Sequence, residues 1–231
     1  MNLKEILNEV LSQSAFLQRD NFASSTDPDA IQMVSFANRA AGEIREFFPW
    51  NFLRKSAQIT LIDGQLSYDL PADFDAYVTE SMWKAYGARN VVIPTPERQW
   101  SFIKAGNPGN AISYYAKLIG GKLEFTAVTG GDIINFDYIS NAVVRDAAGE
   151  LKERFTADTD EYIMNADTLI LGTKAFWKLE KEMPSGVVDQ KEFRQHLKRD
   201  ISKDTPSVVI RSRSSREGTP WAPPISENYL W

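Results

Sequence analysis

The sequence has no cysteine, a single histidine and no long apolar run. The absence of cysteine excludes disulfides, thiolate nucleophiles and cysteine-based metal sites. The lone His196 lies in a charged helical pattern, with no second histidine or acidic partner at ligand spacing, so we expect a solvated surface residue. Because no stretch of about 18 apolar residues occurs, we expect no membrane-spanning helix. The amphipathic N-terminus does not have the pattern of a signal peptide.

The overall composition is that of a globular protein with an acidic balance. A chain of 231 residues is long enough for one large domain or two small ones. Its hydrophobic content of 43% allows it to bury a core without covalent staples. The formal net charge of −5 argues against a dedicated DNA-wrapping or membrane-surface protein.

Two helices are predicted before residue 50. The second begins with strong signals, because Asp27 can cap it and Pro28 suits its first position. Pro49 then ends it. The first helix is predicted from Leu3, Ile6, Leu7, Val10 and Leu11, and the loop after it has Phe16, Leu17 and Phe22 as expected anchors. The second, central helix has an apolar face of Ile31, Val34, Ala37, Ala41, Ile44 and Phe48, widened by Met33, Phe36, Ala40 and Phe47, so we expect it to be covered on two sides.

After Trp50 the hydrophobic period changes to that of strands. Alternating residues at 57–61 and 66–70 flank Asp63-Gly64, which predicts a hairpin between them. Further strands are expected at 78–86, 91–93, 113–119, 122–127 and 133–140, with a short helix from Glu97 to about Gly106. The Gly120-Gly121 and Gly130-Gly131 pairs predict turns rather than phosphate cradles, because no Lys-Ser/Thr follows either pair.

The helical period returns after residue 157. Asp158, Asp160 and Asn165 are candidate caps for a well-buried helix that contains Leu169, Ile170, Thr173, Phe176, Trp177 and Leu179. After Pro184-Ser185-Gly186, a helix with a thinner seam of Val187, Phe193, Leu197 and Ile201 follows. The predicted fold is therefore α+β. An α-helical bundle is formed by residues 1–54 and 146–204, and an antiparallel β domain (55–145) is inserted into it. An extended C-terminal tail (205–231) follows.

The tail has an unusual composition. Its prolines at 206, 220, 223 and 224 exclude a helix, yet it is rich in arginine and aromatic residues. Such a segment either wraps its own domain or docks in a groove of a neighbouring subunit or partner. The candidate docking residues are Arg211, Arg213, Arg216, Trp221, Tyr229 and Trp231.

No catalytic, cofactor-binding or metal-binding residues are assigned, and no cofactor is expected. Carboxylates gather at Asp63, Asp69, Asp73, Asp75 and Glu80, and a second acidic group, Asp158, Asp160 and Glu161, is expected to cap a helix rather than to bind an ion. Paired carboxylates can serve a glycosidase or hold a metal, but the spacing supports neither. We expect a solvated acidic face of a loop.

Three segments resemble a known family. Residues 24–50 combine the Asp-Pro-Asp helix start with the closing Phe-Phe-Pro-Trp; residues 68–75 read Tyr-Asp-Leu-Pro-Ala-Asp-Phe-Asp; and residues 155–160 read Phe-Thr-Ala-Asp-Thr-Asp. In this order they resemble the head-to-tail adaptor proteins of tailed bacteriophages, the group that includes the tail tubular protein A of short-tailed phages. The resemblance covers residues 1–200, and the basic and aromatic tail departs from it.

The resemblance implies a structural virion protein of the phage neck or tail, assembled in the host cytoplasm. It implies a ring of twelve copies that joins the portal to the tail nozzle, with tail fibres as a further candidate partner, and through which double-stranded DNA passes. An acidic chain suits such a conduit, because it binds phosphates weakly. Two alternatives remain open. One is another connector, such as a head-completion stopper or tail terminator, and the other is a cell-wall hydrolase that uses pairs among Asp69, Asp73 and Asp75.

Overall fold

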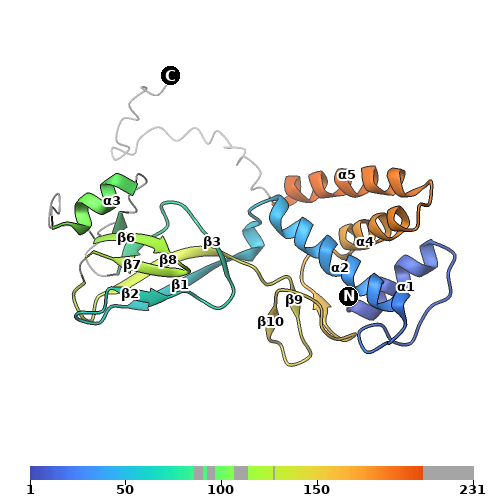
Figure 1. Cartoon of the computed structure of the whole chain (residues 1–231), viewed down its shortest axis with the longest axis horizontal. Helices are drawn as coiled ribbons and strands as arrows, with labels where there is room; N and C mark the ends of the chain where they lie inside the picture. Colours follow the sequence, from blue (N-terminus) through green and yellow to red (C-terminus); the bar gives the residue numbers. More distant parts are fainter. Residues whose placement is uncertain (86–90, 93–96, 107–113, 127, 205–231) are drawn as a thin grey trace, which may run out of the picture.

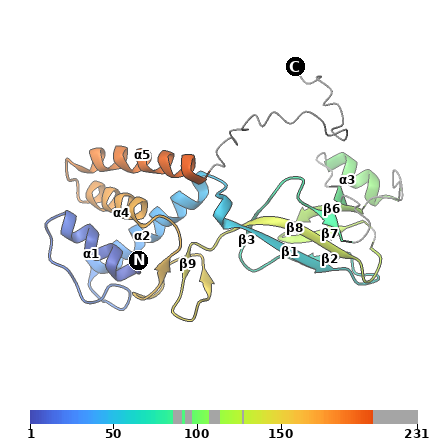
Figure 2. The same ribbon diagram turned by 180° about the vertical axis from the view of Figure 1, so that it is seen from behind.

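The computed structural model describes residues 1–85, 91–92, 97–106, 114–126 and 128–204. These form two lobes that lie end to end, as Figure 1 and the reverse view in Figure 2 show. Four helices and a small sheet make up the helical lobe, and two larger sheets and one helix make up the β lobe. The α+β fold class and the helical bundle with its β insertion are confirmed.

The helical lobe contains α1 (Leu3–Gln13), α2 (Pro28–Phe47), α4 (Ala166–Glu180) and α5 (Gly186–Asp204). Three of these helices begin at side-chain caps. Asn2 and Glu5 form a reciprocal capping box on α1, Asp27 accepts a hydrogen bond from the Asp29 N–H, and Asn165 accepts one from the Asp167 N–H. Of the three predicted caps before α4, only Asn165 has that role.

The buried face of α2 matches the prediction except at its edges. Met33, Phe36, Ala37, Ala40, Ala41 and Ile44 are buried as predicted, whereas Ile31 and Phe47 are exposed. Small residues allow α4 to approach closely, since a Cβ added to Gly172 would lie 3.1 Å from the Ala40 Cβ. The face is therefore centred on alanines, which a hydrophobicity pattern ranks below isoleucine.

Two other apolar predictions for the helical lobe are wrong. Phe22 is fully buried, but Leu17 is 90% exposed. Phe16 is 47% exposed, although its ring lies 4.9 Å from the Trp177 ring between centroids. In α5, Phe193 and Leu197 are buried as predicted, whereas Val187 is exposed. These side chains stay on the surface because α1 and α4 end here, α2 and α5 begin here, and no other element of the described residues packs over this end.

The predicted hairpin at Asp63-Gly64 does not form. β1 (Arg54–Thr60) pairs with β8 (Ile133–Ser140), and β2 (Ser67–Asp69) pairs with β7 (Lys122–Phe125), so the two strands belong to different sheets. Asp63 instead accepts a 2.5 Å hydrogen bond from the Gly130 N–H, which ties this turn to the β7–β8 connection. The Asp-Gly pair turns the chain from one sheet into the other.

The remaining strands of the β lobe agree with the sequence prediction, with two exceptions. Within the predicted strand at 78–86, only β4 (Trp83–Lys84) forms, after a turn in which Glu80 has a φ of 61°. An unpredicted strand, β3 (Phe74–Tyr77), precedes this turn, and both strands pair with β8. β5 (Val91–Val92) lies parallel to β6 (Tyr114–Ile119), whereas the other pairings are antiparallel. α3 (Glu97–Lys104) lies beside this sheet, as Figure 1 shows.

A small sheet in the helical lobe was not predicted. It contains β9 (Val144–Arg145), β10 (Leu151–Lys152) and β11 (Glu161–Tyr162). The two acidic residues beside it, predicted as helix caps, hold loops instead. Asp158 accepts from the N–H groups of Phe22 and Ala23, and Asp160 accepts from two N–H groups of its own loop.

Strand β8 connects two hydrophobic cores. Its Ile134, Phe136 and Tyr138 pack into the core of the β lobe, whereas the next residue, Ile139, packs into the core of the helical lobe. Because successive side chains of a strand point to opposite faces, a single strand can contribute to both cores.

Candidate interaction surfaces

The junction between the lobes is an ordered aromatic turn. Trp50 is buried, its indole Nε1–H donates a 2.8 Å hydrogen bond to the Ile44 carbonyl, and its ring contacts Phe48 and Phe52. The short helix η1 (Asn51–Leu53) follows, and the Asp204 carboxylate accepts a 2.6 Å hydrogen bond from the Asn51 N–H. The end of α5 is thereby joined to the start of the β lobe.

An ionic cluster lies on the β side of this junction. Asp73 accepts from the Lys55 ammonium at 2.5 Å, from the Ser140 hydroxyl at 2.6 Å and from the Tyr138 hydroxyl at 2.8 Å. Partial burial alone would raise the pKa of Asp73, but these three donors outweigh it and lower the pKa to about 2. Burial and the neighbouring carboxylate raise the pKa of Tyr138 to about 12, so its hydroxyl remains a donor.

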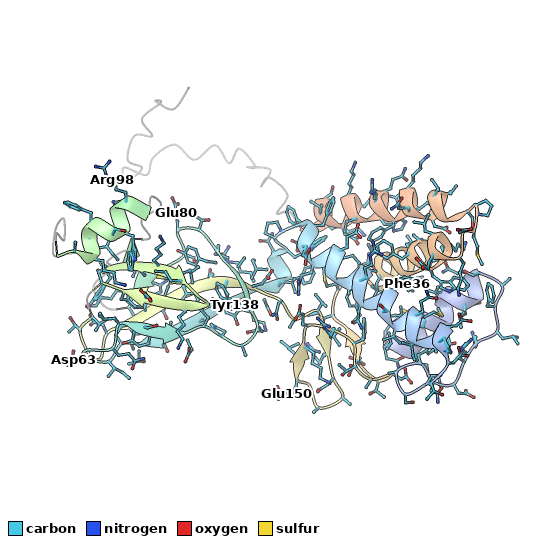
Figure 3. All side chains as sticks on the ribbon, viewed as in Figure 1. Phe36, Asp63, Glu80, Arg98, Tyr138 and Glu150 are labelled. Carbon is cyan, nitrogen blue, oxygen red and sulfur yellow. The ribbon has the colours of Figure 1, made fainter. Side chains whose placement is uncertain are left out.

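The acidic stretch does not form one site. Asp63 lies at the far end of the β lobe, and Glu80 and Tyr138, which contacts Asp73, lie well away from it (Figure 3). Asp69 is exposed and pairs with Lys122 at 3.0 Å. A glycosidase also needs a protonated carboxylic acid, and the lowered pKa of Asp73 keeps it ionised. The expectation of a solvated acidic face is therefore wrong for Asp73, which is an ion-paired structural residue.

The same junction has a groove on the side of the helical lobe, which we call the junction groove. It encloses about 430 Å³. We call its apolar residues, Ile44, Trp50, Phe52 and Met164, the floor and its charged residues, Asp167, Asp200, Lys203 and Asp204, the rim. The lining residues are Ile44, Trp50, Phe52, Met164, Asn165, Asp167, Thr168, Asp200, Lys203 and Asp204.

The opposite end of the helical lobe exposes several apolar side chains, and we call this surface the distal end. A 2.9 Å ion pair between Lys181 and Asp29 brings the start of α2 to the end of α4, and α5 begins at the same end, with Gly186 against Leu179. The exposed apolar side chains there are Phe16, Leu17, Ile31, Val187 and Val188. Exposed apolar residues gathered at one end are typical of an interaction surface.

The β lobe exposes a second set of apolar side chains. Ile62 and Leu66 flank Asp63, which Figure 3 places at the end of the β lobe farthest from the helices, and Phe102 is exposed on α3. The elongated molecule thus presents apolar side chains at both ends. Sequence reasoning did not assign these surfaces, although the surplus of apolar residues at Leu17, Ile31 and Val187 was a signal for them.

The described residues contain little that suggests ligand chemistry. His196 is partly exposed on α5 and faces Arg199 at 3.4 Å. Nowhere in these residues do three His, Asp or Glu side chains gather closely enough to hold a metal ion. None of the helices in the described ranges combines the length and apolar character that a membrane crossing needs. All six predicted docking residues of the tail, Arg211, Arg213, Arg216, Trp221, Tyr229 and Trp231, lie outside the described residues.

The fold and surfaces define an elongated α+β protein with exposed apolar patches at both ends, a class suited to assembly. The chain belongs to the SU10 adaptor protein family, whose sequence pattern matches residues 1–169. This confirms the resemblance to phage head-to-tail adaptors and identifies a structural adaptor protein of the phage neck or tail. A comparison with individual curated proteins finds no match. The family match ends within α4, so α5 and the tail lie beyond it.

Proposed function

We propose that the protein assembles into a ring of about twelve copies that joins the portal of a DNA-filled head to the tail nozzle. The genome leaves the head through this ring. The observation that carries the proposal is membership of the SU10 adaptor family over residues 1–169. The net charge of −5 is compatible with a conduit, because an acidic chain holds passing DNA weakly.

The two exposed ends support an assembly of this kind. A closed ring of identical chains joins two different surfaces of each copy, in a heterologous contact that repeats until it closes. The distal end of the helical lobe is one such surface, and we assign it to contacts with the portal and lateral neighbours. We assign the β lobe to the outer or nozzle side, where tail fibres are candidate partners.

The first experiment is native mass spectrometry of the purified chain, alone and after mixing with the portal from the same genome. We expect either a closed oligomer of about twelve or a monomer that forms such a ring only on the portal. A monomer that ignores the portal would reject the proposal. A ring that binds another neck protein in preference to the portal would favour a head-completion stopper or tail terminator.

Single substitutions can assign the surface. Val188 in α5 and Phe102 in α3 are both more than half exposed, so changing either to serine should leave the fold intact. We expect Val188→Ser to weaken ring formation or portal attachment and Phe102→Ser to leave both unchanged. The reverse result would assign the β lobe instead.

We also propose that the tail attaches the protein to an adjoining chain through Arg211, Arg213, Arg216, Trp221, Tyr229 and Trp231. Aromatic residues and arginine tend to dominate interface energies. A chain that lacks residues 206–231 should then fold normally and attach poorly to its partner. Unchanged attachment would rule out this role for the tail.

A further inference from the structure

We propose that the junction groove is the receptor for the tail of a neighbouring copy. The tail's arginines would lie on the acidic rim of the groove and its aromatic side chains on the apolar floor. The inference rests on the proposed function, since it needs copies that stand side by side in a ring.

The floor of the groove offers an uncovered aromatic surface. Phe52 is 48% exposed although its ring contacts the buried Trp50, at 5.7 Å between centroids. Ile44 and Met164 complete the apolar part of the lining. An exposed phenyl ring beside a fixed indole is the kind of surface on which a tryptophan or tyrosine from another chain packs.

The rim of the groove carries an excess of negative charge. Asp167, Asp200 and Asp204 face only one cation of the lining, Lys203, which is 3.6 Å from Asp200 and 76% exposed. Asp200 is only 12% exposed and already accepts hydrogen bonds from the Asn165 amide and the Thr168 hydroxyl. The exposed Asp167 is therefore the rim carboxylate that best matches a guanidinium group, which binds carboxylates through paired N–H donors.

The tail carries the residue types that complement the groove, which are arginines for its acidic residues and aromatic residues for its apolar ones. Arg211, Arg213 and Arg216 come first and Trp221, Tyr229 and Trp231 follow. The described chain ends at Asp204, on the wall of the groove itself, so every copy in a ring starts its tail beside a groove. Residues 205–231 span at most about 90 Å when extended, which is enough to reach across a neighbouring copy.

Six residues separate Asp204, on the groove wall, from Arg211. A turn needs only four residues, so the connection permits either the chain's own groove or a neighbour's, and the cross-linking experiment below distinguishes them. We assign the neighbour's groove, in keeping with the proposed ring. A contact of this kind would link each copy to the next around the ring.

The absence of cysteine permits a clean cross-linking test. Lys203→Cys places a thiol on the rim and leaves the floor intact, and Ala222→Cys places one beside Trp221 in the tail. The two single variants are mixed, assembled under the conditions in which rings form, and oxidised. We expect a mixed dimer on a denaturing gel. The control partner is Leu17→Cys, whose position at the distal end is 90% exposed, and it should not cross-link to Ala222→Cys.

Further variants test the charge match. Exchanging all three tail arginines for glutamine, or Asp167 for asparagine, should lower the yield of the mixed dimer several-fold while the ring mass stays the same. A double variant with both Lys203→Cys and Ala222→Cys is the last test. If its disulfide forms only within one chain, as a cross-linked monomer, the assignment to a neighbour is overturned.

Ring mass, measured on the same samples, separates the two proposals. Rings that form without the mixed dimer would overturn this inference alone. If no ring forms, either alone or after mixing with the portal, both this inference and the proposed function would be overturned.

Discussion

The ionic cluster around Asp73 makes a quantitative prediction about stability and pH. Asp73→Asn keeps the shape of the side chain but removes the charge that Lys55, Ser140 and Tyr138 stabilise. Its carboxylate is only 23% exposed, so solvent screens these interactions weakly. The variant therefore isolates the contribution of one charge to the joint between β1, β8 and the loop before β3.

The magnitude follows from the lowered pKa. A shift from the ordinary value of 3.8 to about 2 corresponds to roughly 2 kcal/mol of folding free energy at neutral pH, by linkage. We therefore expect Asp73→Asn to lower the free energy of unfolding by about 2 kcal/mol at pH 7. This is a large part of the total for a protein whose stability is of the order of 10 kcal/mol.

The sign of the pH dependence follows from the direction of the shift. A carboxyl group whose pKa is lowered in the folded state contributes stability above its unfolded pKa, and this contribution is lost as the pH falls through the folded pKa. The difference between the native chain and Asp73→Asn should therefore be full above pH 5, about half at pH 3 and small at pH 2.

Urea denaturation followed by tryptophan fluorescence at several pH values measures this difference. The matched control is Asp69→Asn, because Asp69 is 84% exposed and its ion pair with Lys122 should contribute less than about 1 kcal/mol. If Asp73→Asn costs no more than Asp69→Asn at pH 7, or if its cost is the same at pH 2 and pH 7, the electrostatic reasoning is wrong.

Substitutions at three further positions test packing by urea denaturation. Gly42→Ala should raise the free energy of unfolding by about 1 kcal/mol, because its Cβ would meet nothing within 4 Å and alanine is the better helix former. Gly172→Ala should lower it by about 1–3 kcal/mol, because its Cβ would come within 2.9 Å of the Phe193 ring. Trp50→Ala should cost about 3–5 kcal/mol and Trp50→Phe much less, since phenylalanine loses only the hydrogen bond to the Ile44 carbonyl and part of the ring. Equal effects of the two glycine substitutions would contradict the close packing of α4 against α5 and α2.

The helices could be predicted because their signals are local. A cap such as Asp27 or Asn165 and an apolar repeat of 3.6 residues lie within the helix that they specify. The edges of the buried face of α2, such as the exposed Ile31, were harder to predict, because their burial depends on partner helices such as α4, whose Gly172 is more than a hundred residues away. Where two helices approach closely, alanine is the better contact residue and a larger Ile31 is left outside.

The strand pairing could not be predicted for a related reason. Asp63-Gly64 is a strong turn signal, but a turn specifies only that the chain reverses, not that the strands on either side pair with each other. The partner of β1 is β8, about 80 residues later, and their register is fixed by side chains such as Phe136 that must enter the core of the β lobe. Alternation identified β1, β2 and β8, and the long-range packing chose their partners.

The candidate site shows the same division between local and long-range information. The tail was recognised from its composition alone, because prolines, arginines and aromatic residues are visible in any sequence. The junction groove was not, because it brings together residues of α2, η1, α4 and α5 that are distant in the chain. Individually, Phe52 and Asp200 are an ordinary aromatic residue and an ordinary surface acid.

The arrangement of β8 gives the two lobes a shared mechanical element. Tyr138 donates to Asp73 within the β lobe, while the adjacent Ile139 is packed among the helices. A rotation of one lobe against the other would have to displace one of these neighbours, and either displacement exposes a buried side chain or breaks an ion-paired hydrogen bond. Trp50 closes the second connection between the lobes through its hydrogen bond to Ile44. Both connections would have to break or shift before one lobe could rotate freely against the other.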